Sequence, residues 1–204
     1  MQYNSNIHNR RTIRLAHYDY SQAGYYFLTL CCQDRAHQFG KVIQGQMQLN
    51  PAGQMIKKWY QTLPNKFPNI QCHEMIIMPD HFHCIIEIKK TTPPKNIGAD
   101  QRVNEKVGTD QRKNKVGTDQ RVCPTTDNKH KMTPTIGDII QWFKTMSTNE
   151  YIRGVKQKGW PRFNKRLWQR NYYEHIIRND QALENIRKYI INNPKKWQED
   201  RSDQ

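Results

Sequence analysis

The chain has 204 residues and a formal net charge of +15 at neutral pH. This length suffices for one domain with a sizeable core, and the excess of positive charge favours a polyanionic partner such as nucleic acid, although ribosomal and membrane-surface proteins share it. The sequence contains no run of 18 apolar residues and no apolar signal core near its start. We therefore expect a soluble, intracellular protein and exclude a membrane-spanning one.

Secondary-structure elements are expected along most of the chain. The patterns predict strands at 25–32 and 45–49, a helix at 51–64, strands at 71–78 and 82–88, a helix from 135 to about 154, a strand at 167–177 and a helix at 181–193. Asn50 is the expected N-cap of the first helix, Asp180 that of the last, and Pro194 its stop. Short connections between neighbouring strands indicate an antiparallel sheet with helices packed on it, an α+β fold.

The segment at about 90–132 interrupts this order. It contains the repeats IGADQR, VGTDQR and VGTDQR, beginning at Ile97, Val107 and Val116, and almost no other apolar residues. Such a segment buries too little surface to offset the entropy of ordering it. We expect one domain, 1–204, interrupted by a disordered insertion; a DNA-contact role for its lysines is the less favoured alternative.

The five cysteines are scattered and odd in number: Cys31, Cys32, Cys72, Cys84 and Cys123. No C-x-x-C pair occurs among them, which indicates reduced thiols packed as small apolar side chains. A zinc site of Cys72, His73, His81 and His83 is a disfavoured alternative because the usual paired spacing is missing.

Two histidines stand at the start of the strand expected at 82–88, in MPDHFHCIIEI. Side chains alternate along a strand, so His81 and His83 project from one face while Phe82 projects from the other. The pair suits a metal ion, whereas the simpler interpretation is two half-buried histidines beside a sheet. Asp80 is expected to be a turn residue in preference to a carboxylate that orients a histidine, and Glu87 either approaches the metal or lies beyond it in solvent.

Tyr189 and Asn193 are four residues apart in the last expected helix, so both lie at one edge of its apolar stripe. Taken alone, this pattern is that of an amphipathic helix with a half-buried tyrosine.

Together, the His-x-His strand and the Tyr-Ile-x-x-Asn-Pro helix resemble the single-tyrosine HUH transposases, in particular the REP-associated tyrosine transposases and the related insertion-sequence transposases. Further matching stretches are RRTIRL at 10–15, YDY at 18–20, LNPAG at 49–53 and WQRNYYEH at 168–175. Asp80 departs from the pattern, since the family often has Asn there. The resemblance implies a ferredoxin-like α+β fold, the HUH endonuclease fold, with the His pair on a central strand and the tyrosine helix over its face.

The resemblance also implies a transposase that cleaves and rejoins single-stranded DNA at hairpin-bearing ends through a 5′-phosphotyrosine. Tyr189 would be the nucleophile, and His81, His83 and Asn193 would hold Mg²⁺ or Mn²⁺ to polarise the scissile phosphate. The expected partner is DNA with a hairpin or palindromic repeats in the bacterial cytosol or nucleoid; a homodimer stays open. The alternatives are another HUH endonuclease, such as a replication initiator, and a non-catalytic ferredoxin-like module that binds nucleic acid.

Basic residues mark the expected DNA surface: Arg10, Arg11, Arg14, Lys165, Arg166, Arg170 and Lys188. Trp160, Phe163 and Trp168 interleave with the later ones. Stacking on unpaired bases and packing into the core are both open for these aromatic side chains.

Overall fold

The computed structural model describes residues 18–90 and 133–202, with side chains described as far as residue 197. The insertion expected at about 90–132 lies outside the described residues, as do Arg10, Arg11 and Arg14. No helix of the described part is both long and apolar enough to cross a membrane.

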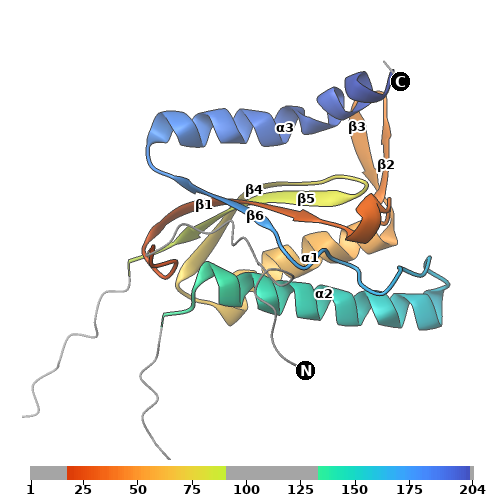
Figure 1. Cartoon of the computed structure of the whole chain (residues 1–204), viewed down its shortest axis with the longest axis horizontal. Helices are drawn as coiled ribbons and strands as arrows, with labels where there is room; N and C mark the ends of the chain where they lie inside the picture. Colours follow the sequence, from red (N-terminus) through yellow and green to blue (C-terminus); the bar gives the residue numbers. More distant parts are fainter. Residues whose placement is uncertain (1–17, 91–132, 203–204) are drawn as a thin grey trace, which may run out of the picture. The chain divides into compact units, whose positions relative to one another are not determined.

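The centre of the fold is a four-stranded antiparallel sheet (Figure 1). Its strands are β1 (Gly24–Cys31), β4 (Ile70–Ile77), β5 (His81–Ile88) and β6 (Tyr173–Ile177), in the spatial order β4-β5-β1-β6. A short hairpin of β2 (Gly40–Ile43) and β3 (Gln46–Leu49) forms a second sheet. The arrangement confirms the expected α+β fold, and β5, which carries both histidines, is a central strand.

Helices cover both faces of this sheet. α1 (Pro51–Lys66) and α2 (Ile136–Lys158) pack on one face and α3 (Asp180–Ser202) on the other (Figure 1). Alternation along β5 produces the two layers: Phe82 belongs to the core under α1 and α2, whereas Ile85 packs with Ile190 of α3. One strand therefore supplies a buried apolar face and a second face on which α3 rests.

The first two long helices begin at side-chain caps. The Asn50 side chain accepts a hydrogen bond from the Gly53 N–H, as expected for the start of α1. Thr135 and Asp138 form a capping box at the start of α2. The helix ends at Lys158, about a turn later than predicted, and is followed by the C-cap residue Gly159 in the left-handed conformation.

The strand predicted at 167–177 is correct only from Tyr173 onward. Trp168 is buried, forms an isolated bridge with Cys32, and donates from its indole Nε1 to the Ser147 Oγ at 3.0 Å. The apolar residues before Tyr173 are thus core side chains of an irregular segment. β2 was not predicted at all.

Two predictions about α3 are wrong. Its cap is Asn179, whose Oδ1 accepts from the Ala182 N–H at 2.8 Å, and not Asp180. The helix also continues through Pro194 to Ser202. Proline removes one helical hydrogen bond, and the turn that follows is anchored because the Trp197 ring packs on those of His37 and His81.

Candidate active site

The histidine pair lies on the face of β5 that α3 covers. His81 is opposite Cys31 and His83 is opposite Thr29 in the neighbouring strand β1. Both side chains are buried, at 6% and 4% exposure, and their ring centroids are 4.6 Å apart. The rigid strand thus holds two imidazoles side by side, as the alternation predicts.

Each imidazole is fixed through its Nδ1 atom. His81 Nδ1 lies 2.5 Å from Asp80 Oδ1, and His83 Nδ1 lies 2.8 Å from the Thr29 Oγ1. These contacts leave both Nε2 atoms available to groups in the pocket that the two histidines line. Outer partners of this kind set the tautomer and orientation of histidines that bind metals.

Asp80 does more than form a turn, which corrects the preference stated from the sequence. Its buried carboxylate accepts from His81 and also contacts Arg35, with Oδ2 3.1 Å from the guanidinium Nε. Burial acts to raise the pKa of Asp80, but the hydrogen bond from His81 and the charges of His81 and Arg35 lower it below its usual value. Asp80 therefore remains ionised and orients both side chains.

His83 is held neutral at neutral pH. Burial lowers its pKa to about 3, and the nearby charges of His81 and Arg35 act in the same direction. A neutral imidazole has a free lone pair, which a metal ligand requires.

Helix α3 brings Tyr189 and Asn193 to the same place. The Tyr189 hydroxyl oxygen lies 3.3 Å from His83 Nε2, and its ring meets Phe27 edge-on at 6.0 Å between centroids. Tyr189 is 39% exposed, while Asn193, one turn later, is buried. The structure thus brings Tyr189 and Asn193 of α3 together with His81 and His83 of β5, although the helix and the strand are about a hundred residues apart in sequence.

These side chains line a pocket of about 290 Å³. The sequence did not single out four other lining residues: Thr29, Arg35, Lys196 and Trp197. Arg35 follows Asp34 in a turn where both have positive φ, 53° and 55°. Backbone strain of this type clusters at functional sites. No sequence pattern indicates that Asp34 and Arg35 adopt this conformation.

The donors suit a catalytic metal better than a structural one. Two imidazole nitrogens and one amide oxygen leave open positions for water and phosphate. Among the described residues, no group of three His, Cys, Asp or Glu side chains is placed to hold a metal.

The zinc alternative is wrong. His73 Nε2 pairs with Glu87 Oε2 at 2.9 Å, away from the pair, and the Cys72 thiol contacts the Tyr60 carbonyl in the core under α1. This pairing also settles Glu87, which neither approaches the pocket nor points freely into solvent. The four cysteines of the described part, Cys31, Cys32, Cys72 and Cys84, are free thiols.

The basic residues of the expected DNA surface that are described are all exposed: Lys165, Arg166, Arg170 and Lys188. Lys188 precedes Tyr189 directly. The interleaved aromatic side chains do not point outward, because Trp160 and Phe163 pack against Tyr151 and Trp168 is buried. Core packing is therefore the correct interpretation of these rings.

A protein of Haemophilus influenzae, described as an uncharacterized protein, is 37% identical to this chain over 201 residues. The match covers 97% of this chain and 95% of that protein. The chain belongs to the same family as this protein. No family model matches it.

The fold of the present chain is similar to that of a REP-associated tyrosine transposase whose structure was solved with a bound REP hairpin. The TM-score is 0.50 at 17% identity, and the match covers 90% of this chain and 74% of the transposase. This likeness confirms the fold that the sequence motifs led us to expect.

Proposed function

We propose that the protein is a transposase that cleaves and rejoins single-stranded DNA at hairpin-bearing ends through a phosphotyrosine at Tyr189. The observation that carries the proposal is the 3.3 Å approach of the Tyr189 hydroxyl to Nε2 of a histidine pair, in a pocket that also contains Asn193. The fold shared with a REP-associated tyrosine transposase supports it.

Tyr189 acts as the nucleophile. Its Oη bonds to phosphorus, the bond from phosphorus to the 3′ oxygen breaks, and the phenol proton ends on the released 3′ hydroxyl. The energy of the phosphodiester is conserved in the phosphotyrosine, so a 3′ hydroxyl can reverse the step and join strands. Tyr189 meets the histidine pair of its own chain, which supports an active site completed within one subunit.

His81, His83 and Asn193 are the residues that would hold Mg²⁺ or Mn²⁺. When bound, the ion polarises the phosphoryl oxygen and neutralises charge that develops on it. Asp80 and Thr29 keep the two imidazoles oriented through their Nδ1 atoms.

Arg35 and Lys196 place positive charge in the same pocket. The Arg35 guanidinium is anchored by the Asp80 carboxylate and by Cys31 Sγ, at 3.0 Å from Nη1. Fixed cations next to a scissile phosphate stabilise the charge of the transition state. Arg35 thus links the phosphate to the carboxylate that orients His81.

The substrate proposed is unpaired DNA beside a hairpin. The solved neighbour was bound to a REP hairpin, and the net charge of +15 favours a polyanion. Lys188 lies on the exposed side of α3 next to the nucleophile.

The test is cleavage of a single-stranded oligonucleotide taken from the DNA that flanks the gene and containing its hairpin. Wild-type protein with Mg²⁺ or Mn²⁺ should form an adduct that survives denaturing electrophoresis. Tyr189→Phe should bind the DNA without forming the adduct, and the matched variant Tyr172→Phe should form it normally.

Two results would overturn the proposal. An undiminished adduct in Tyr189→Phe would assign the nucleophile to another residue. Tight binding of the hairpin without cleavage in either metal would favour the non-catalytic nucleic-acid-binding module.

A further inference from the structure

β6 is one of the two outer strands of the sheet, and two of its ring side chains are exposed on the face that carries the active site. Tyr173 is opposite Thr29, which is itself opposite His83, so the three residues form one row across the sheet. His175 is two residues further along β6 and opposite Phe27. Side chains two apart in a strand share a face.

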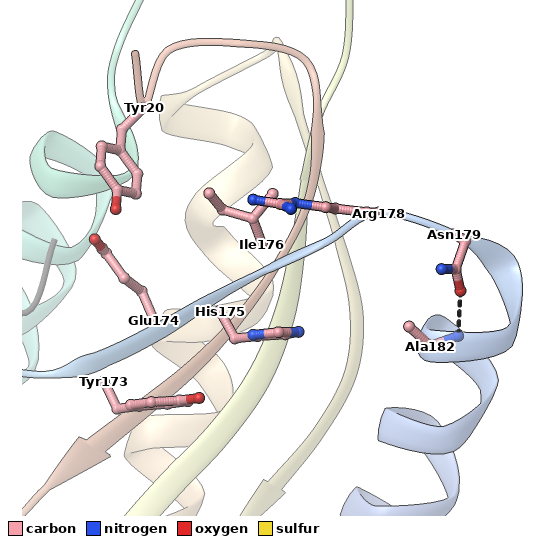
Figure 2. Close-up of a pocket in the computed structure, with 8 residues that line it drawn as sticks. All are labelled: Tyr20, Tyr173, Glu174, His175, Ile176, Arg178, Asn179 and Ala182. Atoms are coloured by element: carbon pink, nitrogen blue, oxygen red, sulfur yellow. Dashed lines mark hydrogen bonds between the residues drawn. The ribbon is translucent and has the colours of Figure 1, made fainter. Parts of the chain in front are cut away.

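Helix α3 leaves this part of β6 uncovered. It begins just after the strand but crosses toward β4 at the opposite edge, where Arg187 Nε lies 3.0 Å from Glu74 Oε2. Tyr173 is 50% exposed, and His175 is exposed as well. Figure 2 shows both rings pointing to one side of β6 and Glu174 to the other.

The spacing of the two rings leaves room for one nucleobase between them, with one stacking distance on each side of the base. Side chains at positions i and i+2 of a strand are about 6.6 Å apart, and stacked bases are separated by about 3.4 Å. A base inserted between Tyr173 and His175 would therefore stack on both rings. Their size and flat shape suit any base, as stacking on aromatic side chains is tolerant of sequence.

The surroundings provide room and charge. The two rings belong to the lining of a pocket of about 490 Å³ at the strand edge, together with Arg178 and Asn179, which are both exposed. Arg178 adds positive charge at the edge of this pocket, but its side chain leaves the chain on the side opposite to the two rings, beside Ile176 (Figure 2).

This pocket is connected to the proposed nucleophile through one ring. Tyr173 and Tyr189 both meet the buried Phe27 edge-on, at 6.4 Å and 6.0 Å between centroids. Phe27 thus packs against Tyr173, and its ring is the single side chain that lies between Tyr173 and Tyr189. A DNA strand with its phosphate at Tyr189 would have a base at Tyr173 within about two nucleotides.

We propose that Tyr173 and His175 form a base-stacking site that holds one unpaired nucleotide next to the scissile phosphate. The inference rests on the proposed function, since it takes the bound polymer to be single-stranded DNA. The site positions the strand by stacking and takes no part in bond breaking.

The experiment measures the affinity of the full-length protein for the flanking-hairpin oligonucleotide, in a Tyr189→Phe background so that no cleavage occurs. Tyr173→Leu should weaken binding about 5- to 100-fold because it removes one stacking surface, whereas Tyr173→Phe should stay within about twofold. The matched control is Ile152→Ala, an exposed apolar residue of α2 on the other face of the sheet.

A scan with abasic nucleotides distinguishes stacking from a structural role. At one position next to the cleavage site, the missing base should weaken binding to the parent protein, and Tyr173→Leu should then cause no further loss. A 2-aminopurine at that position should be quenched by the parent protein and not by Tyr173→Leu.

The inference is overturned if Tyr173→Leu binds as tightly as Tyr173→Phe, or if its loss is the same with abasic nucleotides at every position. Failure of the proposed function gives a different pattern: the adduct at Tyr189 is then absent in the wild-type protein, while the stacking measurements still give an answer.

Discussion

The burial of His83 predicts how the stability of the metal-free protein depends on pH. In the fold the pKa of His83 is lowered to about 3, compared with about 6.5 in the unfolded chain. Between these pH values the unfolded chain binds a proton at His83 that the folded protein does not bind. The free energy of unfolding is therefore highest above about pH 6.5 and falls as the pH drops toward 3. At pH 5.5 the loss relative to pH 7.5 should be about 1.4 kcal/mol from this residue.

Urea unfolding in the presence of a chelator, at pH 7.5 and 5.5, measures this loss. His83→Gln removes the titrating group but retains a side chain that can hydrogen-bond to Thr29, so the difference between the two pH values should shrink by about 1.4 kcal/mol. The control variant Ile152→Ala, which alters an exposed apolar residue of α2, should leave the difference unchanged. An equal loss in wild type and His83→Gln would refute the argument, because it would show that His83 accepts a proton in the fold.

Three further perturbations test the metal site, the core and the insertion. Asp80→Asn should lower the affinity for Mn²⁺, measured by calorimetry, by about 10- to 100-fold, since it removes the charged partner of His81; unchanged affinity would show that Asp80 is only a turn residue. Trp168→Phe removes the hydrogen bond to the buried Ser147 Oγ and should cost about 1–3 kcal/mol in urea unfolding, and a variant as stable as wild type would contradict that role. Replacing residues 91–131 by a short Gly/Ser linker should change stability by no more than about 1 kcal/mol and preserve adduct formation; a folded deletion variant that cannot nick DNA at any salt concentration would make the insertion part of the machinery.

The parts of the fold that local patterns determine were predictable. Alternation along β5 places His81 and His83 on one face, and the Asn50 cap marks the start of α1. Helical spacing puts Tyr189 and Asn193 on one side of α3. None of these patterns alone states that strand and helix meet; that expectation came from the resemblance to the tyrosine transposases.

What could not be predicted depends on contacts between distant segments. Pro194 would end an isolated helix, but packing of Trp197 on His37 and His81 stabilises the turn of α3 that follows it. Arg35 enters the pocket through a strained turn after β1 and a contact to Asp80, which directly precedes the neighbouring strand β5. The same contact gives Asp80 an orienting role that its place after Pro79 does not reveal.

The most direct test of the central claim is to identify the residue that becomes joined to DNA. Wild-type protein is incubated with the flanking-hairpin oligonucleotide and Mn²⁺, digested with protease and nuclease, and analysed by tandem mass spectrometry. We expect a nucleotide linked through its 5′ phosphate to Tyr189, in the peptide that also contains Asn193. A nucleotide on any other tyrosine, or a 3′ phosphate linkage at Tyr189, would contradict it.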